Sequence, residues 1–304
     1  MYSLAIQPDG RILVGGLFGA LAGQFRESIG SLNSDGTLDT TFSAGATGGY
    51  LPSYRGVYCV AVQPDSRILV GGYFDMLSGQ SHTNLGRLNS DGSLDTSFTP
   101  EADNIVYSLA VLTDGKIVVG GVFDRLGGQP RARIGRLDVD TSIDAAFFPG
   151  VNGDVSSLVV QPDGKIVVGG GFTKLGGQER HGIGRLSNTD LTFQNLNFDG
   201  WRVTWLRGGA SPEVWRTTLD ASTNGVDWDD LGACQRIPGG WQLAGVKLAS
   251  NATVRARGFV SGGGISSWFV ETIGGPFTSP SRPRISISRG GSLPFVSVAG
   301  NVGP

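Results

Sequence analysis

Short alternating runs of apolar and polar residues follow one another through the first 190 residues, separated by turns rich in Pro, Asp and Gly. The run Tyr58–Gln63 alternates as a half-buried strand does, and a Pro-Asp turn follows it. A second apolar run ends on two glycines, as in Ile166–Gly170, and a third lies beyond the next loop, as in Leu85–Asn89. Asp91-Gly92 predicts a hairpin turn into a fourth strand that ends near Phe98. The pattern therefore predicts units of four antiparallel strands.

This unit occurs four times along the chain. The aligned copies share an aspartate in their first turn, at Asp9, Asp65, Asp114 and Asp163, so their spacings are 56, 49 and 49 residues. Glycine follows this aspartate in three copies, because the turn needs a left-handed residue there, whereas the second copy has Ser66. We therefore expect the turn at Ser66 to be strained or differently shaped.

A period of about fifty residues built from short strands is typical of the blades of a β-propeller, and the alternatives are a β-solenoid or a string of hairpins. Paired glycines after the second strand would let neighbouring blades approach closely. Four blades are the lower limit for propellers. The propeller would close with these four blades alone, with added strands from the C-terminal region, or by self-association with a partner chain. We predict an all-β chain whose propeller, residues 1–190, has repeats at residues 1–50, 51–104, 105–150 and 151–190.

The recurring pattern QPDGKIVVGGxF…GQ…IGRLNSDGSLDTSF resembles the delta-60 repeat β-propeller family of bacterial proteins. The resemblance covers residues 1–190. It implies a large secreted or cell-surface bacterial protein without a shared catalytic site. The N-terminus shows no signal-peptide pattern, so the expected extracellular localisation rests on the resemblance.

A second domain is indicated by the tryptophans, because all six lie beyond residue 200. Segments 202–205, 214–219 and 252–259 alternate as strands, and Asn224-Gly225 predicts a hairpin. We predict a smaller β-sandwich-like domain over residues 191–275, in which the run VWRTTLDASTNGVDWDDLG resembles one edge of a fibronectin-type sandwich. Its tryptophans would form the core or, where exposed, would stack on sugar rings. A Ser/Gly/Pro-rich tail follows over residues 276–304, with a possible strand at Ile285–Ser288.

One face of the predicted propeller gathers chemically active side chains. In a four-stranded meander, the loops between second and third strands emerge on the same face as the links between blades; we call this the loop face. Arg, Tyr and His on a rigid scaffold are typical of a binding surface, and Arg suits carboxylate, sulfate or phosphate groups. Alternatively, these residues recur because they hold the long loops together. The candidates are Arg26, His82, Arg131 and Arg180 at one aligned position, and Tyr50, Tyr54 and Arg55 in the inserted first link.

Catalytic chemistry has weaker support in the sequence. Glu27 and Glu179 fall on the loop face, and two carboxylates across a cleft would suit glycoside hydrolysis at the right separation, although surface carboxylates are commonly only solvated. The chain has no Gly-x-Ser-x-Gly motif. Its two histidines lack metal-ligand spacing. Calcium at the Asp-Gly turns is an alternative, but these turns offer fewer oxygen ligands than calcium needs. We therefore expect no metal and no cofactor.

Composition narrows the class of partner. The net charge of −2 argues against nucleic acid, and no apolar run reaches the length of a membrane span. The leading hypothesis is a non-catalytic secreted or cell-surface binding or scaffold protein that holds a glycan or a surface protein on its loop face. The alternative is a hydrolase or lyase acting on polysaccharide or ester in the propeller mouth. A purely structural spacer is the third possibility.

Overall fold

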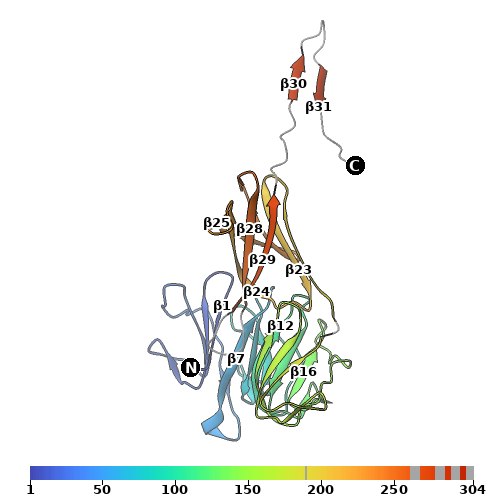
Figure 1. Cartoon of the computed structure of the whole chain (residues 1–304). Helices are drawn as coiled ribbons and strands as arrows, with labels where there is room; N and C mark the ends of the chain where they lie inside the picture. Colours follow the sequence, from blue (N-terminus) through green and yellow to red (C-terminus); the bar gives the residue numbers. More distant parts are fainter. Residues whose placement is uncertain (189, 261–267, 278–284, 289–294, 299–304) are drawn as a thin grey trace.

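The computed structural model describes residues 1–188, 190–260, 268–277, 285–288 and 295–298. Figure 1 shows an arc of small sheets that extends to Leu186, with a sandwich of longer strands above it. Within these described ranges the helical content is one short turn, η1 (Pro52–Tyr54). The predicted all-β repeat architecture is therefore confirmed.

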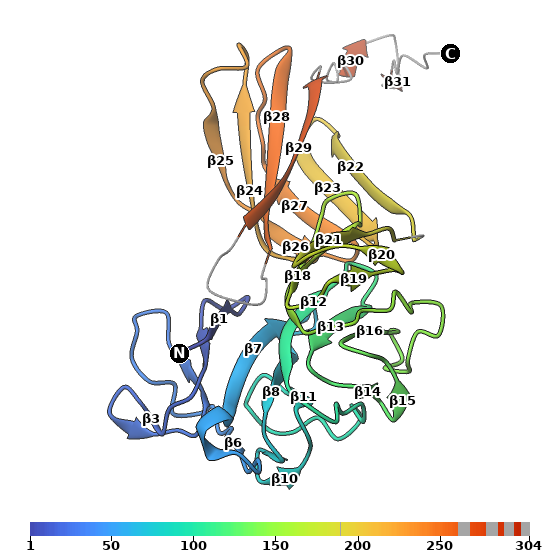
Figure 2. The same ribbon diagram turned by 60° about the horizontal axis from the view of Figure 1, so that its bottom comes forward.

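Each repeat forms a three-stranded antiparallel sheet, and its first strand lies on the inner edge of the arc (Figure 2). The segment predicted as the fourth strand joins the sheet through a single bridge, such as Leu88 with Leu94. The strands are, in chain order, β1 (Ser3–Ile6), β2 (Ile12–Gly15) and β5 (Ile29–Leu32); β7 (Gly56–Val62), β8 (Ile68–Tyr73) and β11 (Leu85–Leu88); β12 (Val106–Val111), β13 (Ile117–Gly121) and β16 (Ile134–Leu137); and β17 (Val155–Val160), β18 (Ile166–Gly170) and β21 (Ile183–Leu186).

The fourth segment is held by an aspartate rather than by a strand ladder. In the second repeat, Asp95 Oδ1 accepts hydrogen bonds from the Ser97 amide and hydroxyl, and Asp95 Oδ2 lies 2.7 Å from Arg87 Nε. The Arg87 guanidinium covers the buried ring of Phe98, 4.8 Å from its centroid. In the first repeat, burial alone would raise the pKa of Asp39, but hydrogen bonds from Thr41 and Arg11 outweigh burial and lower that pKa to about 2.

The loops between second and third strands contain hairpins of their own, and the link that leaves a repeat pairs with the hairpin of the next. The link strand β6 (Ala46–Thr47) pairs with β9 (Met76–Leu77), and the bridges Ala102–Leu126 and Val151–Leu175 repeat this contact. Loops and links therefore form one face, as predicted. The remaining hairpin strands are β3 (Ala20–Leu21), β4 (Gln24–Phe25), β10 (Gln80–Ser81), β14 (Arg125–Leu126), β15 (Gln129–Pro130), β19 (Lys174–Leu175) and β20 (Gln178–Glu179).

Consecutive repeats pack through the glycines of their second strands. A Cβ built on Gly71 would lie 2.6 Å from Val106 Cγ1, and one built on Gly120 would lie 2.6 Å from Val155 Cγ1. No side chain can occupy these positions unless the neighbouring valine moves, so the close approach predicted for the paired glycines is confirmed. Three apolar clusters, one between each pair of neighbouring repeats, form the core of the arc.

The turn at Ser66 has the same shape as its glycine-containing counterparts. Ser66 adopts φ +67°, close to +87° at Gly10 and +88° at Gly115. Its amide donates to the Gln63 carbonyl at 2.9 Å, the distance found for Gly10 and Gln7. Of the two expectations for this turn, strain is therefore the correct one, because a left-handed residue with a side chain costs about 1–2 kcal/mol.

The second domain is a sandwich of two four-stranded sheets around Trp205, which is fully buried. The hairpin predicted at Asn224-Gly225 is present; it connects β24 (Val214–Ser222) to β25 (Asp229–Ala233), which is not one of the three predicted segments. Trp241 also belongs to the core, whereas Trp201 is exposed. The sheets are β22 (Thr192–Phe198), β23 (Arg202–Gly209), β27 (Gly240–Ala244) and β26 (Gln235–Ile237), and β25 (Asp229–Ala233), β24 (Val214–Ser222), β28 (Ala252–Val260) and β29 (Trp268–Phe277).

The predicted end of this domain at residue 275 falls two residues before the end of β29. The predicted strand Ile285–Ser288 is present as β30 and pairs with β31 (Phe295–Val298). The rest of the predicted tail, residues 278–284, 289–294 and 299–304, lies outside the described residues.

The sandwich is fixed to the third repeat at its Asp-Gly turn. The Thr113 amide donates to the Ser211 carbonyl at 2.8 Å, and Leu112 forms a bridge with Pro212. The other repeats carry proline where the third has Thr113, and proline has no amide hydrogen to donate. The connecting segment contacts the same repeat, because Asp190 Oδ2 lies 3.1 Å from Lys116 Nζ.

The contact between repeats predicts that adding a methyl group lowers the free energy of unfolding at a glycine that faces the next repeat, but not at a glycine with open space around it. We expect Gly120→Ala to lower the free energy of unfolding by about 1–3 kcal/mol, because the new Cβ would overpack against Val155. Gly171→Ala is the control, since a Cβ there meets nothing within 4 Å. Urea unfolding followed by circular dichroism measures both variants, and equal effects would contradict the contact as described.

Candidate functional site

A row of tyrosine rings runs across the inner edge of the arc. The Tyr2 and Tyr58 rings stack with centroids 5.0 Å apart, and the Tyr107 ring meets Tyr58 edge-on at 5.3 Å. Tyr2 is 41% exposed, and the other two are partly exposed. Three repeats thus contribute one ring each to a continuous, solvent-accessible aromatic surface.

β-Bulges place two of these rings. The pairing of β7 with β8 shifts between Val57 and Cys59, which leaves Tyr58 as the extra residue. The pairing of β12 with β13 shifts in the same way around Tyr107. A bulge turns its extra side chain away from the regular alternation of the strand. The fourth repeat has the same bulge with Ser156 at this position, so the row ends there.

Tyr54, predicted as a binding residue, lies beside this row. The Tyr58 hydroxyl donates to the Tyr54 carbonyl at 2.8 Å, and the Tyr54 side chain is 54% exposed. Burial, together with the neighbouring Tyr2, Tyr107 and Tyr54, raises the pKa of Tyr58 to about 12. We call Tyr2, Tyr54, Tyr58 and Tyr107 the tyrosine row.

Sequence reasoning missed three of these four tyrosines. Tyr2, Tyr58 and Tyr107 occupy one aligned position of the repeat motif, and this recurrence of an aromatic residue near the start of the first strand is the signal that could have identified them. In the sequence this position is indistinguishable from any other residue of an alternating strand, so it gives no separate functional prediction.

The aligned basic position on the loop face packs against the scaffold. A Cβ built on the facing glycine of the third strand would lie 3.4–3.6 Å from the stem of the arginine in three repeats, and 2.6 Å from the ring of His82 in the second. This contact recurs with the repeat, in agreement with the alternative that these residues hold the loops. The pairs are Arg26 with Gly30, His82 with Gly86, Arg131 with Gly135 and Arg180 with Gly184.

His82 is paired through one ring nitrogen, and its other ring nitrogen is buried. Its Nδ1 lies 2.8 Å from Glu101 Oε1, and the Thr83 amide donates to the same oxygen at 3.0 Å. Its Nε2 is buried beside Gly86 and, among the described atoms, has no hydrogen-bond partner. A buried Nε2 is out of reach of a substrate, so this pair fastens a link to a loop.

Arg131 and Arg180 occupy equivalent positions in different surroundings. Arg131 is only 9% exposed, lies over the Phe148 ring at 5.2 Å, and donates to the Asp144 carbonyl at 3.3 Å. Arg180 is exposed, and its guanidinium donates to the Glu179 carbonyl. The difference arises because a link follows the third repeat at this point, whereas the fourth leads into the sandwich.

The remaining predicted residues divide between two parts of the loop face. Glu27 and Arg55 line one hollow of about 260 Å³ between the first and second repeats. Glu179, in the fourth repeat, lies 3.5 Å from Lys174 and 3.7 Å from His181. Tyr50 is 92% exposed. The structure brings Glu27 and Arg55 together, but it places Glu179 in another repeat.

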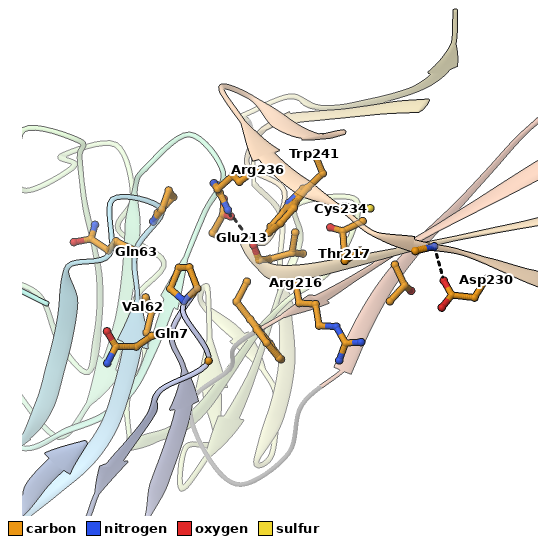
Figure 3. Close-up of a pocket in the computed structure, with 18 residues that line it drawn as sticks. Gln7, Val62, Gln63, Glu213, Arg216, Thr217, Asp230, Cys234, Arg236 and Trp241 are labelled. Carbon is orange, nitrogen blue, oxygen red and sulfur yellow. Dashed lines mark hydrogen bonds and ion pairs between the residues drawn. The ribbon is translucent and has the colours of Figure 1, made fainter. Parts of the chain in front are cut away.

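A larger hollow of about 470 Å³ lies between the turns of the first two repeats and the sandwich (Figure 3). Gln7 and Val62 line it from the repeats, and Cys234, Arg236 and Trp241 line it from the sandwich. Its volume is in the range of small-molecule sites, which are common at domain boundaries.

The side chains that line this hollow pack the sandwich against the repeats, and they include one ion pair. Arg236 Nη1 lies 2.7 Å from Glu213 Oε1, and the Arg236 guanidinium covers the Trp241 ring at 5.3 Å. Burial, followed by the charge of Asp230, raises the pKa of Cys234 to about 12, so its thiol is protonated and a poor nucleophile at neutral pH. No histidine is among the described residues that line the hollow.

Within the described residues, no group of three or more His, Cys, Asp or Glu side chains is arranged to hold a metal ion. In that part of the chain, no helix has the length and apolar character needed to cross a membrane.

The two arginine environments predict different effects on stability. We expect Arg131→Ala to lower the free energy of unfolding by about 1–2 kcal/mol, because it removes the contact of a buried guanidinium with the Phe148 ring and a hydrogen bond to the Asp144 carbonyl. Arg180→Ala, the matched control, should change it by less than about 0.5 kcal/mol. Thermal and urea denaturation measure both, and an equal loss in the two variants would show that burial at this position does not decide its role.

The tyrosine row predicts a late ionisation in alkali. Free tyrosine has a pKa of about 10, whereas the folded pKa of Tyr58 is about 12. The raised pKa favours the folded state below about pH 10, and this contribution is lost as the pH rises through about 12. Ultraviolet absorbance of the phenolate should show a late component that disappears in Tyr58→Phe. An unchanged titration curve would contradict the packing of this ring.

Comparison with known proteins supports the repeat assignment. The family model described as "Domain of unknown function (DUF5122) beta-propeller" matches residues 7–42, 63–98, 112–147 and 161–193. No curated protein matches the chain. The matched segments begin at the turn of each repeat and, in the first three, end at its buried phenylalanine. The repeat region of this chain, residues 7–193, belongs to the DUF5122 β-propeller family.

Proposed function

We propose that this protein is a non-catalytic binding protein of the cell surface or of the secreted fraction, and that it holds a glycan along the tyrosine row. The observation that carries the proposal is the row of contacts across three repeats, in which Tyr58 stacks on Tyr2 at 5.0 Å and meets Tyr107 edge-on at 5.3 Å. The extracellular location follows from the resemblance to the bacterial repeat family.

Aromatic rings of this kind suit a sugar ligand. A tyrosine ring presents a flat apolar face to the C–H groups of a sugar ring, and its hydroxyl can hydrogen-bond to a sugar hydroxyl. Tyr58 and Tyr107 are carried by strands β7 and β12 rather than by free loops, so little side-chain entropy is lost when a ligand binds to these rings. A row that crosses three repeats offers several contacts to an extended chain.

A binding role is favoured over catalysis by the state of the reactive groups. The imidazole of His82 is paired with Glu101, and its other nitrogen is buried. The Cys234 thiol is held in its neutral form by burial. The carboxylates that suggested glycoside hydrolysis, Glu27 and Glu179, belong to different repeats. A glycan held without cleavage is therefore our leading interpretation.

The proposal predicts that glycan binding depends on the rings of the row. Binding to an array of bacterial and plant polysaccharides, followed by calorimetry on any glycan retained, would measure it. We expect Tyr58→Ala and Tyr107→Ala each to weaken binding at least about tenfold, since stacked aromatic anchors dominate such interfaces. Tyr58→Phe should retain most of the affinity, because it keeps the ring.

Phe269→Ala is the matched control, because this exposed aromatic residue lies on the sandwich, outside the row. Circular dichroism would confirm that each variant keeps its strand content. Equal loss in Phe269→Ala and Tyr58→Ala, or a full array without a retained glycan, would contradict the proposal. Product release during the same assays would instead support the polysaccharide-cleaving alternative.

A further inference from the structure

The first and fourth repeats expose the two halves of a contact that the chain makes three times internally. In each internal contact, one repeat presents its forward face and the next repeat presents its rear face. In the second repeat the forward face comprises Ala61, Leu69 and Leu85, and in the third repeat the rear face comprises Leu109, Val111 and Ile117. All six side chains are buried.

The forward face of the fourth repeat is accessible to solvent. It comprises Val159, Val167 and Ile183, the counterparts of Ala61, Leu69 and Leu85. Ile183 is 64% exposed, whereas Leu85 is fully buried. The face therefore keeps the apolar character of the internal contact.

The rear face of the first repeat is accessible in the same way. It comprises Leu4, Ile6 and Ile12, the counterparts of Leu109, Val111 and Ile117. Leu4 is 41% exposed, whereas Leu109 is fully buried. The two exposed faces carry apolar residues at the positions that pair internally, and Met1 stands where Val57, Val106 and Val155 fill the space at a glycine.

Finer features of the internal contact recur on the exposed faces. The glycines that receive a valine from the next repeat have their counterpart in Gly169, where a Cβ would meet nothing closer than 3.9 Å. Internally, the Ser108 hydroxyl accepts a hydrogen bond from the Leu158 amide at 3.1 Å. The fourth repeat carries the exposed Ser157 at the position of Ser108, and the first repeat carries Leu4 at the position of Leu158.

We propose that the forward face of the fourth repeat binds the rear face of the first repeat of a second copy of this chain, and reciprocally. A head-to-tail contact made twice under two-fold symmetry closes on itself. The product is a ring of eight repeats, within the range of propellers. A second copy is the occupant because the chain itself carries both complementary faces, and their apolar surface is the kind that drives association.

The proposal is tested by the mass of the 304-residue chain in solution, using light scattering and sedimentation velocity over a range of concentrations. We expect twice the chain mass of 31.7 kDa. Ile183→Arg and Leu4→Arg should each raise the dissociation constant of this dimer at least about tenfold, because each places an unpaired charge in an apolar contact. Val226→Arg is the control, since Val226 is 78% exposed on the sandwich.

A mixture of the two arginine variants distinguishes a head-to-tail ring from other dimers. One junction of the mixed pair joins two unaltered faces, so mixing should restore a two-chain species that neither variant forms alone. Restoration would also show that both variants are folded. A monomeric wild-type chain, a mass that grows beyond two copies, a dimer insensitive to both substitutions, or a mixture that stays monomeric would each overturn the proposal.

Discussion

The contact of a valine with a glycine of the preceding repeat sets the geometry of the whole arc. Because Gly71 and Gly120 have no side chain, the next sheet approaches until Val106 or Val155 fills the space. That approach brings the first strands of neighbouring repeats side by side along the inner edge. At the junction of Gly71 with Val106, this closeness brings the Tyr58 and Tyr107 rings to a centroid distance of 5.3 Å. A bulkier residue would separate the sheets and the row together.

Much of the repeat architecture could be predicted because it depends on local chemistry that recurs. The Pro-Asp-Gly turns need a left-handed residue, so their position follows from glycine and from its one replacement, Ser66. The fourth segment was predicted as a strand from its hairpin turn and apolar residues. Its single bridge could not be foreseen, because the Asp95–Arg87 pair that holds it joins residues on different segments.

The candidate site was harder to predict for a physical reason. The direction of Tyr58 depends on a bulge, which is a property of the pairing between two strands and not of either strand alone. The loop-face prediction identified a recurring position but could not tell a binding residue from a scaffold residue. Arg131 and His82 were identified as a recurring position, but recurrence in a tandem repeat is also the mark of a scaffold residue, and their contacts with Gly135 and Gly86 are of that kind.

The hydrogen bond from Thr113 to the sandwich distinguishes the third repeat from the other three. This difference limits where a repeat can be gained or lost during evolution. Only the third repeat offers an amide hydrogen at this position, and the segment after the fourth repeat reaches back to it through Asp190. Loss or duplication of a repeat before the third would leave this docking intact. Insertion of one between the third repeat and the sandwich would separate Thr113 from Ser211. The attachment thus restricts change in repeat number to the N-terminal side.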